Sequence, residues 1–254
     1  MSAGGGLFSL EGRVALVTGA AGGLGAAYAV ALAEAGADVA VHDLRAVDET
    51  VERVRALGRR TVGLAGDLAD PAVPGRVVDA TVRGLGGLDV LVNNAGIIRR
   101  TPAAETSDDD WSAVLEVNLS AVFRTCRAAG CHMLAKGRGK IVNVASLLAF
   151  QGGILVPAYA ASKGGVAQLT KALANEWAGR GINVNAIAPG YVRTDNTAPL
   201  QADPVRSRLI LDRIPAGRWA EPADVAGAVV FLCSAASDYV HGHVLVVDGG
   251  WLGR

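Results

Sequence analysis

A tyrosine and a lysine, Tyr159 and Lys163, stand four positions apart, and residues 141 to 162 carry no formal charge. A spacing of four places both side chains on one face of a helix, about one turn apart. A free phenol has a pKa near about 10, and a nearby ammonium group stabilises the phenolate. Without competing carboxylates, that charge acts through a weak dielectric. The pair therefore predicts a general acid or base in an uncharged pocket.

Seven apolar runs must position this pair, and they alternate with segments of helical length. The runs are residues 13–19, 37–43, 60–67, 88–94, 139–146, 182–189 and 243–250. Continuous Val, Ile, Leu and Ala are typical of strands buried on both faces, which indicates a parallel sheet covered by helices. The predicted fold class is α/β, a Rossmann-like doubly wound parallel sheet of about seven strands. We expect a single domain over residues 10–254 and a disordered lead over residues 1–9.

In such a sheet the ligand binds beyond the carboxyl ends of the strands. The first run ends at Gly19, and Gly23 and Gly25 follow before a helical segment. These glycines permit a tight turn and let the backbone approach a pyrophosphate at the helix N-terminus. Ser146 ends the fifth run at the same edge, where it can hydrogen-bond a substrate oxygen or cap a helix.

The end of the second run suggests which dinucleotide binds. Asp43 stands there, and a carboxylate at this position accepts hydrogen bonds from the adenosine ribose hydroxyls and repels a 2′-phosphate. Arg45 is the one ambiguity, because an arginine can bind such a phosphate; we interpret it as an exposed residue at the start of the next helix. The predicted cofactor is NAD.

Composition excludes several classes of function. The 254 residues include 24 Lys and Arg against 24 Asp and Glu, so no charge excess exists to hold a nucleic acid. The three cysteines lack CxxC spacing, which disfavours a disulfide framework or zinc site and favours the cytoplasm. The uncharged runs are broken by glycine and polar residues, so no membrane span is predicted. His241 and His243 lack a third histidine nearby in the sequence, and no metal is predicted.

The motifs, taken in order, resemble those of the short-chain dehydrogenase/reductase family from about Leu10 onward. They are the TGxxxGxG loop at 18–25, NNAG at 93–96, Asn118, Ser146, the YxxxK pair at 159–163 and the Pro189–Gly190 pair. The resemblance implies that Tyr159 exchanges a proton with the substrate while Ser146 holds the substrate oxygen. It also implies that Lys163 binds the nicotinamide ribose and that Asn118 supports a water that relays protons.

The same resemblance implies a set of cofactor contacts and a homotetramer. Asp67 matches the aspartate that contacts adenine, and Thr194 matches the threonine that holds the carboxamide. The full set is Gly19, Gly23, Leu24, Gly25, Asp43, Asp67, Leu68, Asn94, Ala95, Gly96, Tyr159, Lys163, Pro189, Gly190, Val192 and Thr194.

Several longer segments resemble one group within the family, the 2-deoxy-D-gluconate 3-dehydrogenases, also described as 2-dehydro-3-deoxy-D-gluconate 5-dehydrogenases. This implies a sugar acid substrate, whose carboxylate needs a cation and whose hydroxyls need polar partners. Arg99 is the preferred cation because it follows the NNAG segment, and Arg100, Arg206 and Arg213 stay open. The candidate substrate residues are Arg99, Gln151, Arg193 and Asn196, under a lid at about 191–215.

Two other functions fit parts of the pattern. A 3-oxoacyl thioester reductase acting on an acyl carrier protein shares the catalytic residues, but it would favour NADPH and a basic docking surface. A non-catalytic NAD-binding sensor would keep the fold without needing Asn118, Ser146, Tyr159 and Lys163 together. The sequence therefore favours an NAD-dependent oxidoreductase that moves a hydride between nicotinamide and a secondary alcohol or ketone.

Overall fold

A seven-stranded parallel sheet forms the centre of the protein. The computed structural model describes residues 6–254, and residues 1–5 lie outside the described part. The strand order is β3-β2-β1-β4-β5-β6-β7, which confirms the predicted doubly wound fold. The strands are β1 (Val14–Thr18), β2 (Asp38–Asp43), β3 (Thr61–Ala65), β4 (Val90–Asn93), β5 (Gly139–Val144), β6 (Ile182–Pro189) and β7 (Val244–Val247).

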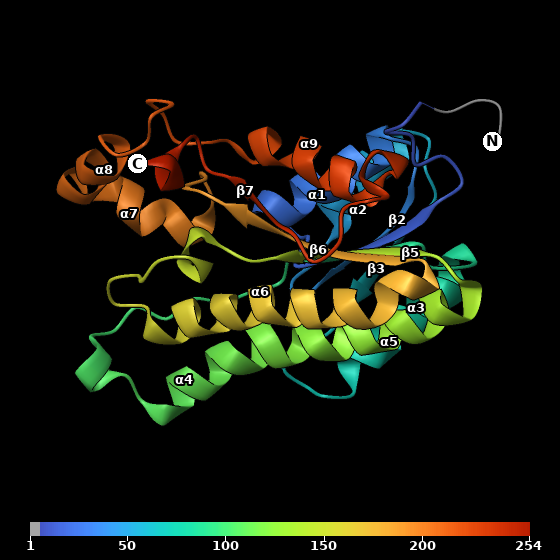
Figure 1. Ribbon diagram of the computed structural model, residues 1–254, viewed down its shortest axis with the longest axis horizontal. Coiled ribbons are helices and arrows are strands. Elements are labelled where there is room, and N and C mark those ends of the chain that lie inside the picture. The colour runs from blue at the N-terminus through green and yellow to red at the C-terminus, as the bar shows by residue number, and fades with distance from the viewer. Residues whose placement is uncertain (1–5) are drawn as a thin grey trace.

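Helices cover both faces of this sheet. The α-helices are α1 (Gly23–Glu34), α2 (Asp48–Ala56), α3 (Val73–Leu85), α4 (Asp108–Leu115), α5 (Ala121–Lys136), α6 (Pro157–Trp177), α7 (Ala198–Ala202), α8 (Pro204–Leu211) and α9 (Pro222–Cys233). Side chains of α1, α2 and α9 pack on one face, and those of α3, α5 and α6 pack on the other (Figure 1). Among the described helices, none is both long and apolar enough to cross a membrane.

Strand β1 shows why the apolar runs form the sheet. All five of its residues are buried. Val14 and Leu16 belong to one hydrophobic cluster, and Ala15 and Val17 belong to the cluster on the opposite face. Side chains alternate between the two faces of a strand, so a strand covered on both sides needs apolar residues at every position.

Buried asparagines join α6 to the sheet. The Nδ2 of Asn93 donates to Asn143 Oδ1 at 2.9 Å, and the Nδ2 of Asn143 donates to Thr170 Oγ1 at 3.0 Å. These residues lie at the ends of β4 and β5 and on α6, and all three are buried. Leaving one such buried group unpaired costs about 1–3 kcal/mol, so the chain of bonds fixes α6 against the two strands.

The segment 191–215 is largely helical. It contains the 3-10 helix η5 (Asp195–Thr197), α7 and α8, which lie beside the C-terminus in Figure 1. A third hydrophobic cluster joins this segment to the loop after β5 and to the C-terminal turn; its members are Leu147, Ile210, Ile214, Trp219 and Trp251. The described part of the expected N-terminal lead also makes contacts, because the Leu7 carbonyl accepts from Ala236 N at 3.1 Å.

Asp89 is a buried carboxylate at the amino edge of the sheet, away from the strand ends that bind ligands. Its Oδ2 accepts from Val14 N at 3.0 Å, and its Oδ1 lies 2.5 Å from Lys136 Nζ and 3.6 Å from Arg13 Nη1. Burial raises the pKa of Asp89, but the hydrogen bonds from Lys136 and Val14 and the two positive charges outweigh it, so the pKa lies below its ordinary value.

We expect Asp89→Asn to lower the free energy of unfolding by about 1–3 kcal/mol at neutral pH, because the cations lose their buried partner. The folded pKa is below the unfolded value of about 3.9, so the stabilisation is complete above that pH and is lost as pH falls through the folded pKa. Urea unfolding near pH 7 and near pH 3 measures the difference from wild type. A difference that does not shrink in acid would contradict this account; Asp238→Asn, at an exposed carboxylate, is the control.

Candidate active site

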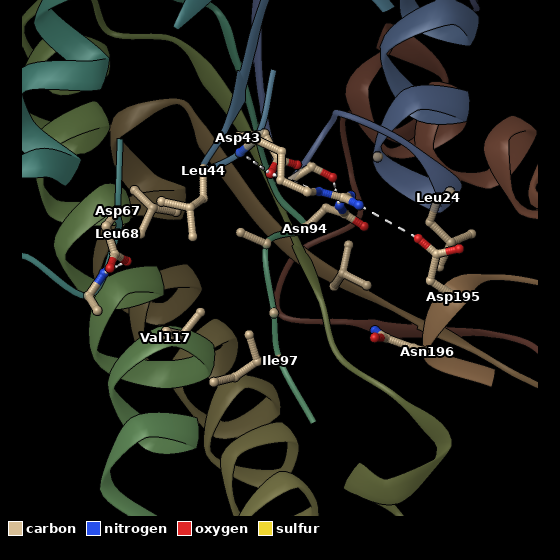
Figure 2. A pocket seen from close by; sticks show the side chains of 18 of the residues that line it. Leu24, Asp43, Leu44, Asp67, Leu68, Asn94, Ile97, Val117, Asp195 and Asn196 are labelled. Atoms are coloured by element: carbon tan, nitrogen blue, oxygen red, sulfur yellow. Dashed lines mark hydrogen bonds and ion pairs between the residues drawn. The ribbon is translucent and has the colours of Figure 1, made fainter. Parts of the chain in front are cut away.

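A cleft of about 880 Å³ opens at the carboxyl edge of the sheet. Its walls come from the glycine loop before α1, the end of β2, the segment after β4, the start of α6 and the η5 segment (Figure 2). It lies where the strand order reverses, since β1 pairs with both β2 and β4. Ligands of doubly wound sheets bind at that reversal.

The glycine loop packs too closely for side chains. A Cβ on Gly25 would lie 2.1 Å from the Gly19 carbonyl oxygen, and a Cβ on Gly19 would lie 2.6 Å from Ala95 Cα. The Nδ2 of Asn94 donates to the carbonyl oxygens of Thr18 and Gly19 at 3.0 and 2.8 Å, which holds the loop against the segment after β4. No side chain caps the N-terminus of α1. Its first N–H groups can therefore bind a pyrophosphate, so the residues present fit a dinucleotide.

Asp43 is fixed in the wall of the cleft by the backbone. Its Oδ2 accepts from Ala21 N at 3.0 Å and its Oδ1 from Arg45 N at 3.0 Å. Arg45 is exposed, as expected, but it lies before α2 instead of at its start, lines the cleft and forms ion pairs with Asp43 and Asp195 (Figure 2). Asp67 and Leu68 line the cleft beyond Asp43.

Asn118 lies in a π-helical turn, Glu116–Ser120, between α4 and α5. Its side chain is buried: Oδ1 accepts from Ile97 N at 2.8 Å, and Nδ2 donates to Ile97 O at 2.9 Å and Ser162 Oγ at 3.2 Å. Such turns are rare and are frequent at functional sites. The side chain holds the segment after β4 beside α6. Its part in a proton relay stays a prediction.

Tyr159 and Lys163 both point into the cleft from α6, but their electrostatics differ from the expectation. Burial raises the pKa of the Tyr159 phenol, while the Ser146 hydroxyl and the Arg100 charge lower it less strongly. Lys163 Nζ donates to Val144 O at 2.6 Å and lies 5.6 Å from the Tyr159 ring centroid. The prediction that Lys163 draws the pKa of the phenol towards neutrality is wrong for the chain alone, because burial dominates and the groups that oppose it are Ser146 and Arg100.

Burial also acts on the lysine. It lowers the pKa of Lys163 to about 8, because the ammonium has left water. At neutral pH the side chain still holds its proton, and it loses that proton as pH rises through about 8. A protonated phenol and a protonated amine therefore face the cleft together near pH 7.

Seven of the residues expected at the site do not line the cleft: Asn118, Ser146, Gln151, Pro189, Gly190, Val192 and Arg193. Ser146 caps the 3-10 helix Leu147–Ala149 by accepting from Leu148 N at 3.2 Å, so the cap and the contact with Tyr159 coexist. Pro189, Gly190 and Val192 lie outside its lining. Gly190 has a packing reason, since a Cβ there would lie 2.6 Å from Asp248 Cα. The other cofactor candidates border the cleft.

Comparisons with known proteins place this geometry in a family. Residues 19–252 match the short-chain alcohol dehydrogenase model described as enoyl-(acyl carrier protein) reductase. The chain is 53% identical over 248 residues to 2-dehydro-3-deoxy-D-gluconate 5-dehydrogenase of Escherichia coli (strain K12), covering 97% of this chain and 98% of that one. It is 51% identical to the enzyme of the same name from Bacillus subtilis (strain 168), covering 97% of each chain.

Solved structures agree. A crystal structure of a candidate 2-deoxy-D-gluconate 3-dehydrogenase from Agrobacterium tumefaciens, with bound NADP, is 58% identical, covers 98% of this chain and 99% of that chain, and has a TM-score of 0.92. The chain belongs to the short-chain dehydrogenase/reductase family. A candidate gluconate 5-dehydrogenase from Beutenbergia cavernae, with NADP at low occupancy, is 52% identical, covers 98% and 100%, and has a TM-score of 0.95.

The residues expected to bind substrate in this dehydrogenase do not converge as predicted. Arg99 and Asn196 line the cleft, but Arg99 Nε lies 3.3 Å from Asp110 Oδ1. Arg193 lies 3.1 Å from Glu221 and donates to Gln201 at 2.9 Å, outside the cleft lining. The Oε1 of Gln151 accepts from Trp251 Nε1 at 3.2 Å.

Sequence reasoning favoured Arg99 over its neighbour. Arg99 lines the cleft and Arg100 does not, but Arg100 has contacts of its own at this end of the site. Arg100 Nη2 donates to the Asn196 carbonyl at 2.7 Å, and its charge acts on the Tyr159 phenol. Adjacent residues after a strand point in different directions, and no sequence signal separates them. The lining residues Ile97 and Val117 were also missed, although Val117 adjoins the Asn118 motif.

We expect Gly25→Ala to lower the free energy of unfolding of the dehydrogenase by about 1–3 kcal/mol, because the new Cβ overlaps the Gly19 carbonyl. That loss corresponds to roughly 2–4 °C in melting temperature per kcal/mol for a chain of this size. Gly22→Ala is the matched control, since its nearest outside atom is Arg45 Nη2 at 3.9 Å and its φ of −172° is extended. A Gly25→Ala chain that melts with the control would refute the close packing.

Proposed function

We propose that the enzyme moves a hydride between NAD and a secondary alcohol or ketone carbon of a sugar acid. The candidate substrates are 2-dehydro-3-deoxy-D-gluconate and 2-deoxy-D-gluconate, the acids in the names of its relatives. The observation that carries the proposal is one cleft holding the glycine loop and Asp43 at one end and the half-buried Tyr159 and buried Lys163 at the other.

The bound cofactor supplies or accepts the hydride, and the chain manages the proton. Burial keeps Tyr159 protonated near neutral pH, so its phenol donates to the substrate oxygen in reduction and recovers a proton in oxidation. The Ser146 hydroxyl hydrogen-bonds the same oxygen. Lys163 keeps a positive charge near the phenol below about pH 8 and binds the nicotinamide ribose. Asn118 holds the wall of the site.

Arg100 is the best-supported partner for the substrate carboxylate. Its guanidinium charge reaches Tyr159, and no acidic side chain among residues 6–254 forms an ion pair with it. Arg99 already pairs with Asp110. An arginine can bind a carboxylate through two parallel hydrogen bonds, which orients the substrate as well as attracting it. The proposed lid over 191–215 contacts Arg100, because the Asn196 carbonyl accepts a hydrogen bond from Arg100 and Asn196 lines the cleft.

We also propose that NAD is preferred over NADP and that the enzyme is a cytoplasmic homotetramer. The fixed Asp43 carboxylate supports NAD, although two similar structures contain NADP. Trp111 on α4 and Phe123 on α5 are partly exposed, which supports subunit contacts through this helical layer. Three free thiols, Cys126, Cys131 and Cys233, support a reducing compartment.

A 3-oxoacyl thioester reductase acting on an acyl carrier protein is the second candidate, because the description of the matching family model names a reductase of another acyl carrier protein thioester, the enoyl form. An equal number of acidic and basic residues gives no general attraction to an acidic carrier protein. The sugar-acid proposal is therefore preferred. The rate of NADH oxidation with the keto forms of sugar acids, compared with the rate with a 3-oxoacyl thioester, distinguishes the two candidate functions.

We expect Tyr159→Phe to reduce kcat by about 10²–10⁴-fold, because the phenol proton is lost while the ring still packs. Its affinity for NADH, measured by fluorescence titration, should stay within about twofold. Retained turnover would exclude Tyr159 as the acid and base. A chain that binds NADH but reduces no sugar acid, even as wild type, would favour the sensor alternative.

We expect Arg100→Ala to raise KM for the sugar acid by about tenfold or more, since a hydrogen bond to a charged group contributes about 1.5–3 kcal/mol. Arg99→Ala is the matched control and should change KM by less than about threefold, because Arg99 already pairs with Asp110 at the exposed rim. A larger rise in KM for Arg99→Ala than for Arg100→Ala would instead identify Arg99 as the residue that binds the substrate carboxylate.

A further inference from the structure

Arg45 lies between two aspartates at the nucleotide end of the cleft. Its Nε is 3.6 Å from Asp43 Oδ1, and its Nη1 is 3.7 Å from Asp195 Oδ2. The guanidinium therefore spans from Asp43 at the end of β2 to Asp195 in the η5 segment, the two aspartates labelled in Figure 2, and all three residues line the cleft. One side chain thus connects the cofactor wall to the segment proposed as the lid.

The two aspartates hold Arg45 differently. Asp43 is buried, and backbone N–H groups of Ala21 and Arg45 fix both of its oxygens. The side chain of Asp195 is 96% exposed, and among residues 6–254 its one ion pair is the pair with Arg45. Asp43 therefore belongs to the fixed wall, whereas Asp195 acts on the cleft chiefly through Arg45.

A dinucleotide with a 2′-phosphate changes the charge at this end of the cleft. Asp43 occupies the position at which doubly wound folds bind the ribose hydroxyls of a dinucleotide. A 2′-phosphate at that position places a charge of about −1.5 to −2 beside the Asp43 carboxylate. Such a phosphate needs an arginine nearby. Arg45 is the cation that lies beside Asp43, whereas Arg99 and Lys163 line the cleft from the segment after β4 and from α6.

We propose that Asp195 determines specificity for the cofactor: it holds Arg45 and so weakens binding of a 2′-phosphorylated dinucleotide relative to NAD. This rests on the proposed function, since it assumes a nicotinamide dinucleotide in the cleft. To contact the phosphate, the guanidinium must give up Asp195, and the Asp195 carboxylate also repels the phosphate. NAD requires neither change. An exposed ion pair of this kind corresponds to about a two- to fivefold effect on affinity.

The surrounding segment is anchored without Asp195. Thr194 N donates to Thr197 Oγ1 at 3.1 Å, and the Asn196 carbonyl accepts from Arg100 at 2.7 Å. The side chain of Asp195 itself takes no part in these bonds. Asp195→Asn should therefore keep the fold and the η5 segment while removing one negative charge.

Calorimetric titration of the purified enzyme with NAD and with NADP measures Kd for each dinucleotide and tests the proposal without relying on turnover. Asp195→Asn should lower Kd for NADP about two- to fivefold and leave Kd for NAD within about 1.5-fold. Arg45→Ala should raise Kd for NADP. In the Arg45→Ala background, Asp195→Asn should lower Kd for NADP by less than half as much as it does in the wild-type background. Asp203→Asn is the matched control: Asp203 lies in the same segment, caps α8 and does not line the cleft.

The outcomes separate this proposal from the function on which it rests. Unchanged Kd values in Asp195→Asn, equal shifts for both dinucleotides, or an unaltered effect in the Arg45→Ala background would overturn the role of Asp195 while leaving the oxidoreductase intact. Failure of the wild-type chain to bind either dinucleotide would overturn the proposed function itself.

Discussion

Burial of the Lys163 ammonium group, one turn of α6 from the half-buried Tyr159 phenol, is the constraint on which the site depends. Moving such a charge out of water costs on the order of several kcal/mol unless fixed partners replace the solvent. The Val144 carbonyl supplies that partner for Lys163 at the end of β5, so the lysine can only be placed where α6 meets the sheet. The bond from Asn143 to Thr170 holds the same junction, and the bond from Asn118 to Ser162 Oγ ties α6 to the turn before α5.

The order of the strands then brings the glycine loop and Asp43 to the same edge of the sheet as Tyr159 and Lys163. Because β1 and β4 are neighbours, the loops after them pack together through Asn94 and the glycine turn. The first loop carries the N-terminus of α1, and the second runs under Asn118 towards Tyr159. Along this edge the ends of β1 and β4 lie between Asp43, at the end of β2, and Lys163, beside the end of β5. The cleft therefore follows from sheet topology as much as from any side chain.

The sequence contained most of this arrangement, and its failures have physical causes. Strand ends were predictable because strands buried on both faces need unbroken apolar runs, and Gly19, Asp43 and Ser146 follow three such runs. The pKa of Tyr159 was not predictable, because it depends on how much protein surrounds the phenol and on where the Lys163 ammonium points. The choice between Arg99 and Arg100 depends on the direction of the backbone after β4.

Burial is unevenly distributed along the cleft, and this separates chemistry from specificity. Lys163, Asn118 and Asp43 are buried and bonded to backbone, so each keeps one position. Arg45, Arg99 and Asp195 are largely exposed and joined by ion pairs above 3 Å, which contribute little to stability. Under the proposals above, exchanging an exposed charge would change ligand binding without moving Tyr159 or Lys163.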